Sequence, residues 1–222
     1  MVRNVSVRRA QRLGTGLSVM AMPLAFVFAF SVHPGLLHPH LLGPVGLVLR
    51  AHHAGLLQLV HVVVTFATGL LIVVAVHFMS LLDRTVAAWA GFVGAAMAVL
   101  GAIILAADKG ALCLTMSALD TVPEEQFAAM MPGLLAMFSL KGYMVLLWGV
   151  LLLPIGFAIQ AIALVATGAF GRSSGLLFLI GVLFVGFPDG AEVINLTASV
   201  LMAIALVPYG AKLVAAGWQT PG

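Results

Sequence analysis

Long runs without a charged residue constrain this chain more than any other feature of its sequence. Asp, Glu, Lys and Arg are absent between Arg12 and Arg50, Arg50 and Asp83, Arg84 and Asp108, Lys141 and Arg172, and Glu192 and Lys212. The apolar core of a bilayer is ~30 Å thick, and a helix needs about 20 apolar residues to cross it. Most of these runs supply that length, so the sequence predicts a polytopic transmembrane helix bundle.

Composition excludes the soluble classes of protein. Of the 222 residues, 63% are hydrophobic and 8% are charged, against roughly 45–50% and 25% in an average soluble domain. A soluble fold of this size could not remove so much apolar surface from water. We therefore exclude a soluble enzyme and a nucleic-acid partner, and we expect the lipid bilayer, together with any other membrane subunits, as the partner. The single cysteine, Cys113, excludes an internal disulfide.

The chain is expected to be all-α, with about six membrane-spanning helices in one domain over 15–217. A basic tail precedes this domain at 1–14 and a short tail follows it at 218–222. The expected helices cover about 15–32, 45–79, 86–107, 142–169, 175–187 and 191–215, with an interfacial segment over 108–140 on the outer side. At 1.5 Å per residue the second helix would be ~50 Å long, so its start would lie at or above the interface. A cleaved signal peptide is the alternative for 15–32, although the segment before His33 lacks a good small-x-small cleavage site.

The distribution of basic residues predicts the orientation. With the N-terminus inside, most of them fall on the cytoplasmic side, as in inner-membrane proteins of bacteria: Arg3, Arg8, Arg9, Arg12, Arg84, Arg172 and Lys212. Arg50, Lys109 and Lys141 fall outside. We expect one of these three to pair with Asp108, Asp189 or Glu192, the acids near the same interface.

Three segments carry a resemblance to a known family. The first is Arg9-Ala-Gln-Arg12-Leu-Gly14. The second is the run from Ser117 to Phe127, after which the chain continues through Gly142-Tyr143 into the expected fourth helix. The third is the run from Gly168 to Gly181. In these segments the chain resembles a family of uncharacterised six-helix bacterial membrane proteins. The resemblance implies a six-helix bundle in a bacterial membrane, and it implies no activity and no catalytic residues. The break around Asp189 and Glu192 and the histidine cluster depart from that family's pattern.

All seven histidines lie in the first 77 residues. The candidate metal ligands are His33, His38, His40, His52 and His53, because the short linker must bring them to one membrane face and neutral imidazoles suit copper, zinc or iron. No metal motif of fixed spacing supports this set. Two-histidine haem ligation is disfavoured, because His61 and His77 would lie ~24 Å apart along one helix and the later helices carry no histidine.

Polar residues follow three of the expected helices. Arg50, Gln58, His61 and Thr65 share one face of the helix at 45–79, Glu192 and Asn195 share a face with Ser199 on the last helix, and Gln160 lies on the fourth. Exposure of these groups to lipid would be costly, so we expect them to face the bundle interior, near the helices at 142–169 or 191–215. They could form hydrogen bonds between helices or line a polar cavity for a small ligand or ion.

The segment from Phe187 to Glu192 has two interpretations. The preceding helix, at 175–187, would span only ~20 Å, so the break could lie within the membrane, like the discontinuous helices of transporters. Alternatively, Asp189 caps the last helix in an ordinary outer turn. No catalytic signature accompanies any of these features. The sequence thus favours an accessory subunit or a component that binds a small or lipid-like ligand, with a metal- or haem-dependent redox protein and a small-solute transporter as alternatives.

Overall fold

A computed structural model describes residues 2–36, 41–137, 149–185 and 192–219. These residues are helical and contain no strand, which confirms the all-α prediction. The helices are α1 (Val2–Ser31), α2 (Pro44–Ala51), α3 (Gly55–Leu82), α4 (Ala88–Leu119), α5 (Glu124–Met137), α7 (Leu152–Ala166), α8 (Arg172–Phe184) and α9 (Glu192–Gln219).

Four of these helices are long and apolar enough to cross a membrane. The qualifying stretches are Ser6–Ser31, Gly55–Leu82, Ala88–Leu119 and Glu192–Trp218, whereas α7 and α8 are apolar but shorter. The structure thus has the helices of a membrane protein, and the expected number of six crossings stays a prediction.

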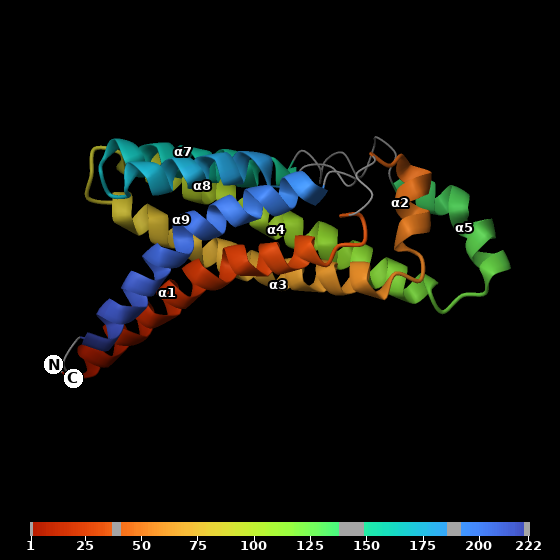
Figure 1. Cartoon of the computed structure of the whole chain (residues 1–222), viewed down its shortest axis with the longest axis horizontal. Coiled ribbons are helices and arrows are strands. Elements are labelled where there is room, and N and C mark those ends of the chain that lie inside the picture. Colours follow the sequence, from red (N-terminus) through yellow and green to blue (C-terminus); the bar gives the residue numbers. More distant parts are fainter. Residues whose placement is uncertain (1, 37–40, 138–148, 186–191, 220–222) are drawn as a thin grey trace.

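The apolar helices form a closed ring. In the described residues, α1 packs against α3, α3 against α4, α4 against α7, α7 against α8, α8 against α9, and α9 against α1. Figure 1 shows α1 and α9 side by side, extending together beyond the other helices at the end where both termini lie. With α2 and α5 set aside, helices that follow one another along the chain are therefore neighbours in space, and α9 closes the ring against α1.

Glycines set the closest helix approaches in this ring. A Cβ atom at Gly94 of α4 would lie 2.7 Å from the carbonyl oxygen of Gly156 in α7, and one at Gly210 of α9 would lie 2.7 Å from that of Gly16 in α1. Small residues at such crossings allow the backbones to approach and increase dispersion contacts, which drive helix association in lipid.

The interior of the ring is mainly aromatic and aliphatic, and it also holds the buried amide of Gln160. Phe78, Phe157 and Phe178 pack edge to face, with ring centroids 5.4–6.4 Å apart. Gln160 of α7 is fully buried, and its Nε2 donates to the carbonyl oxygens of Ala75 (2.9 Å) and Gly91 (3.2 Å). This amide links α7 to α3 and α4, as the expectation of an interior polar group at Gln160 requires.

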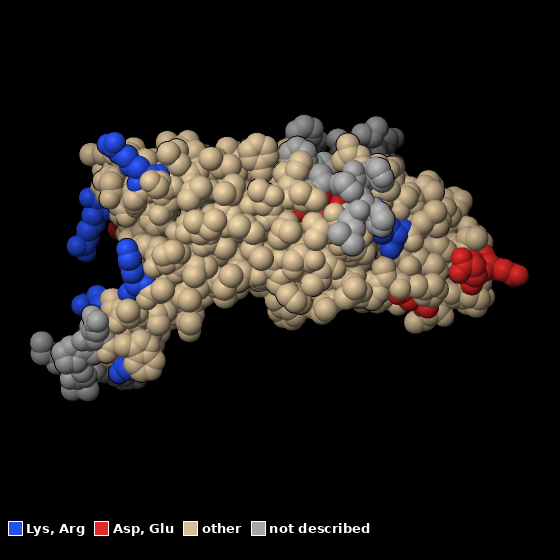
Figure 2. All heavy atoms as spheres, viewed as in Figure 1, with Lys and Arg blue, Asp and Glu red and all other residues tan. Residues whose placement is uncertain are grey.

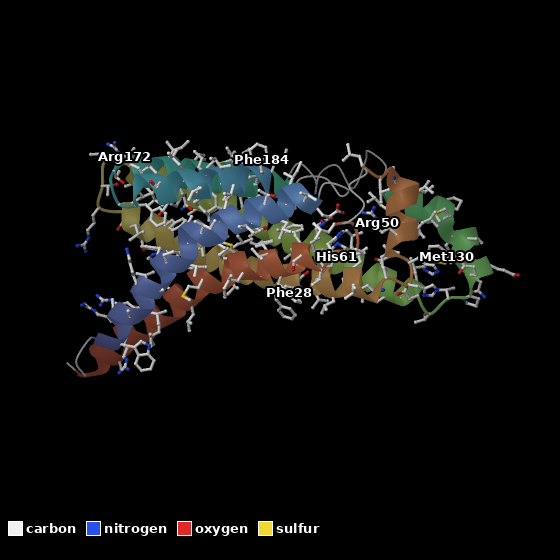
Figure 3. The ribbon with its side chains drawn as sticks, viewed as in Figure 1. Phe28, Arg50, His61, Met130, Arg172 and Phe184 are labelled. Atoms are coloured by element: carbon white, nitrogen blue, oxygen red, sulfur yellow. The ribbon has the colours of Figure 1, made fainter. Side chains whose placement is uncertain are left out.

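Most charged residues lie toward the two ends of the molecule. Figure 2 shows Lys and Arg gathered mainly at the end with the termini, and Asp and Glu mainly at the opposite end, around α5, with a blue and a red patch between the two ends. We call the first the basic end and the second, which carries α2, α5 and Asp120, the acidic end. Figure 3 places Arg172 at the basic end and Met130 at the acidic end.

Three of the expected boundaries are clearly wrong, two of them in the middle of the chain. The helix expected over 45–79 is divided into α2 and α3 by residues 52–54, where His53 has a left-handed φ of 55°. The connection expected from Asp108 begins later, because α4 continues to Leu119. Asp108 does not end the helix, since its Oδ2 lies 3.2 Å from Lys109 Nζ and no proline or β-branched run follows before Leu114.

Helix α1 also begins earlier than expected, at Val2 rather than near residue 15. The basic segment continues the helix because α9 runs beside it: the Arg9 guanidinium lies 4.8 Å from the centre of the Trp218 ring. A Cβ at Gly217 would lie 3.0 Å from Leu13.

Candidate functional site

A buried ion pair joins α2 to the first residue of α9. Arg50 Nη1 lies 3.1 Å from Glu192 Oε1, and Glu192 is only 1% exposed. His33, which follows α1, brings its Nδ1 within 3.2 Å of the same carboxylate oxygen. We call His33, Arg50 and Glu192 the Glu192 cluster. It confirms the expectation that one of Arg50, Lys109 and Lys141 pairs with Asp108, Asp189 or Glu192.

Local sequence explains how the three side chains meet. Gly43 and Pro44 begin α2, with Pro44 at the first helical positions where its missing N–H is not needed. Arg50 then falls in the last turn of this short helix. Glu192 opens α9, where the positive end of the helix dipole favours a carboxylate.

Gly35 packs directly against the ion pair. A Cβ at this position would overlap Glu192 Oε1 and Arg50 Nη1. Its backbone N–H also donates to His33 Nδ1, at 3.1 Å. His33 Nδ1 therefore has two alternative roles: without a proton it accepts from Gly35, and with one it donates to Glu192.

A second group of polar residues surrounds the break between α2 and α3. Asp120, just after α4, accepts a hydrogen bond from the backbone N–H of His53 at Oδ1 (2.8 Å) and from Gln58 Nε2 at Oδ2. Ser117 Oγ donates in turn to Gln58 Oε1, at 2.9 Å. We call His52, His53, Asp120 and Glu124 the Asp120 cluster. The carboxylate of Asp120 satisfies donors on both sides of the break and so stabilises the unusual backbone of His53.

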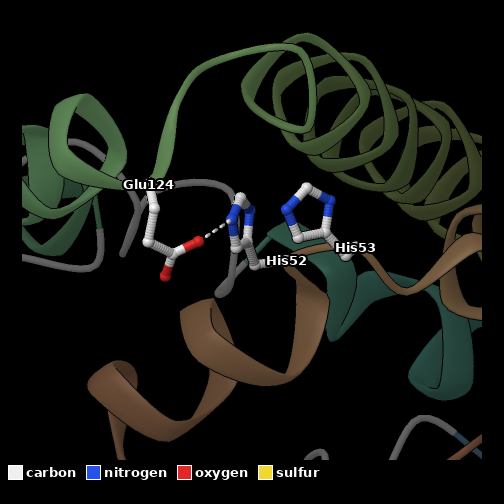
Figure 4. Close-up of side chains that lie close together, drawn as sticks. All are labelled: His52, His53 and Glu124. Carbon is white, nitrogen blue, oxygen red and sulfur yellow. Dashed lines mark ion pairs between the residues drawn. The ribbon is translucent and has the colours of Figure 1, made fainter.

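His52 lies at the centre of this cluster. Its ring stacks on Phe127 with centroids 3.6 Å apart and planes within 7°. Nδ1 lies 3.4 Å from Asp120 Oδ1, and Nε2 lies 3.6 Å from Glu124 Oε2, the contact drawn in Figure 4. The side chain is only 8% exposed, yet neither ring nitrogen has a hydrogen-bond partner among the described residues.

Helices α2 and α5 pack in a small core of their own. This core is separate from the interior of the ring and contains Val48, Ala51, Leu57, Met116, Leu119, Phe127 and Leu134. It brings the end of α2, the end of α4 and the start of α5 together, and so positions both polar clusters at the acidic end.

The stripe expected on the second helix is only partly preserved. Arg50 lies on α2, whereas Gln58, His61 and Thr65 lie on α3, because the helix is broken between them; Figure 3 labels Arg50 and His61. Gln58 bonds to residues at the end of α4, and Thr65 Cγ2 lies 3.9 Å from a Cβ built at Gly110 of α4. Arg50 meets the last helix through Glu192, as expected for this stripe, whereas Gln58 and Thr65 lie beside the longer α4.

The stripe on the last helix is buried as expected. Glu192, Asn195 and Ser199 are each at most 3% exposed, and Ser199 Oγ donates to the carbonyl oxygen of Asn195 at 2.7 Å. His77, which the sequence gave no partner, has its Nε2 2.8 Å from the Tyr209 hydroxyl.

The structure divides the expected metal-ligand set. His33 lies against Glu192, whereas His52 and His53 lie against Asp120. His38, His40 and Asp189 lie outside the described residues. Asp120 and Glu124 were not among the predicted site residues. The available clue was that one acid precedes α5 and another begins it, close to Phe127, which can stack on an imidazole.

Comparison of the chain with protein-family models, with curated proteins and with solved structures finds no match in any of the three. The function is therefore argued from the two clusters themselves.

Gly35→Ala should destabilise the protein by about 1–3 kcal/mol, the usual cost of overpacking a filled site. The added methyl group would displace the Arg50–Glu192 pair. Thermal unfolding in detergent would measure the loss, with Gly43→Ala as the matched control, because a Cβ there meets nothing within 4 Å. Equal melting temperatures for the two variants would show that the pair is not packed on Gly35.

Proposed function

We propose that this chain is a multi-pass membrane protein that binds a small or lipid-like ligand without covalent chemistry, and that the Glu192 cluster is its binding site. The observation that carries the proposal is the burial of a charged pair, Arg50 and Glu192, in an otherwise apolar bundle. Ionisable groups at such positions are costly and are commonly functional.

Stability alone does not account for this pair. Removing two charges from water costs several kcal/mol per ion, and apolar residues of similar volume often stabilise a fold as well or better. The ring already packs through glycines and aromatic side chains, so the ion pair adds a specific recognition element rather than the main packing energy.

The chemistry of the cluster defines the ligand class. The guanidinium of Arg50 offers a fork of donors suited to a carboxylate or phosphate, and its side chain, at 18% exposed, is more accessible than that of Glu192. His33 can donate or accept. A ligand with an anionic or hydrogen-bonding head group and an apolar body would take Arg50 as its partner while the apolar helices accommodate the rest.

The proposed setting is the bacterial inner membrane, with the basic end in the cytoplasm and the acidic end outside. The separation of Lys and Arg from Asp and Glu in Figure 2 supports this orientation. The lipid bilayer is the proposed partner, other membrane subunits are further partners, and nucleic acid is not one.

A second candidate is small-solute transport. It is favoured by the position of Glu192 as the first residue of α9, after the short α8. Charged groups where one helix ends and another begins are typical of transporter binding sites.

Protein purified from native membranes should carry a small molecule visible by native mass spectrometry. Arg50→Gln should lose it, and Glu192→Gln should weaken its retention, because both change the charged groups of the cluster. Arg172→Gln, at the basic end, is the matched control and should retain it. Identical adduct profiles for all four proteins would overturn the proposal, and solute flux in proteoliposomes that Glu192→Gln abolishes would move the function to transport.

The orientation predicts which cysteines a membrane-impermeant maleimide reaches in intact cells. In a Cys113→Ala background, Glu125→Cys should be labelled from outside, because Glu125 is exposed on α5 at the acidic end. Arg84→Cys, in the exposed turn between α3 and α4, should react only after the membrane is permeabilised. The opposite pattern would reverse the orientation.

A further inference from the structure

The geometry points to a divalent transition-metal site of the zinc class in the Asp120 cluster, with His52, His53 and Glu124 as ligands. This site is distinct from the Glu192 cluster, so it stands or fails independently of the proposed function. Each of the three side chains offers one ligand atom, and these atoms all lie within 4.8 Å of one another.

The distances suit a tetrahedral ion. Zinc binds imidazole nitrogen and carboxylate oxygen at about 2.0–2.2 Å, which separates neighbouring ligand atoms by about 3.4 Å. His52 Nε2 and Glu124 Oε2 lie 3.6 Å apart already. Figure 4 shows the His53 ring beside that of His52, and small side-chain rotations would bring the three donors onto one ion.

His52 provides a second, independent observation. Both nitrogens of this nearly buried ring have no hydrogen bond to any described residue, and such a group is costly to leave unsatisfied. A metal on Nε2 would satisfy one nitrogen. The other faces Asp120 Oδ1 at 3.4 Å, the arrangement in which a carboxylate orients a metal-bound histidine.

One side of the site is open to solvent, and this determines how an ion and water would reach it. His53 and Glu124 are exposed, with 59% and 79% of their side-chain surfaces accessible, so the ion would be reached from the acidic end and would keep a position for water. Two imidazoles and one carboxylate suit zinc and its neighbours better than magnesium or calcium, which prefer oxygen ligands. The ion would also link the start of α5 to the break between α2 and α3.

The test uses the full-length protein in detergent, with zinc alone as the probe. Equilibrium dialysis followed by elemental analysis should give one zinc ion per chain at micromolar concentration. His52→Ala, His53→Ala and Glu124→Gln should each weaken binding about tenfold or more. Glu125→Gln is the matched control, because it removes the adjacent exposed acid, and it should bind as the wild type does.

If a histidine variant fails to fold, zinc binding by Glu124→Gln becomes the decisive measurement, because the Glu124 side chain is exposed and glutamine has nearly the same shape. No zinc bound by the wild type at high micromolar concentration would refute the site. So would wild-type affinity in Glu124→Gln, or a loss of zinc that follows His38→Ala and His40→Ala instead.

Discussion

A charge inside an apolar bundle must have a partner of opposite sign, and this requirement fixes the acidic end of the molecule. Arg50 and Glu192 are far apart in sequence, yet their side chains meet in a buried pair. For the two to meet, α2 must lie over the start of α9, and the turn after α1 must pass close enough for Gly35 to pack on both. The position of α2 then determines where the chain breaks before α3, and so where His52 and His53 lie.

The rest of the bundle forms the apolar surroundings in which these groups act. The closed ring of helices is held by backbone approaches at glycines and by an aromatic interior, neither of which involves charge. Polar side chains are thus available for recognition at one end, where α2 and α5 form a small core beside the ring. Two clusters result. One is closed around a carboxylate, and the other is open to solvent through His53 and Glu124.

Features that depend on composition and periodicity could be predicted, whereas features that depend on distant contacts could not. The charge-free runs predicted an all-helical chain, and the cost of unpaired charge predicted that one of Arg50, Lys109 and Lys141 would pair with Asp108, Asp189 or Glu192, as Arg50 does. The break at 52–54 escaped prediction because no proline marks it and Asp120, far along the chain, stabilises it. The roles of Asp120 and Glu124 could not be predicted for the same reason, because they depend on contacts with residues far away in the sequence. Charged residues at 108 and 109 suggested a helix end, but neither residue type breaks a helix, and α4 continues to Leu119.

A double-mutant cycle on the ion pair tests the central claim most directly. Arg50→Met and Glu192→Leu would be compared singly and together by reversible unfolding in detergent. Each single substitution leaves one charge buried without its main partner and should cost about 3–5 kcal/mol, whereas the double substitution should recover most of that loss. A double variant whose loss equals the sum of the two single losses would show that the residues do not interact, and would contradict this account of the acidic end.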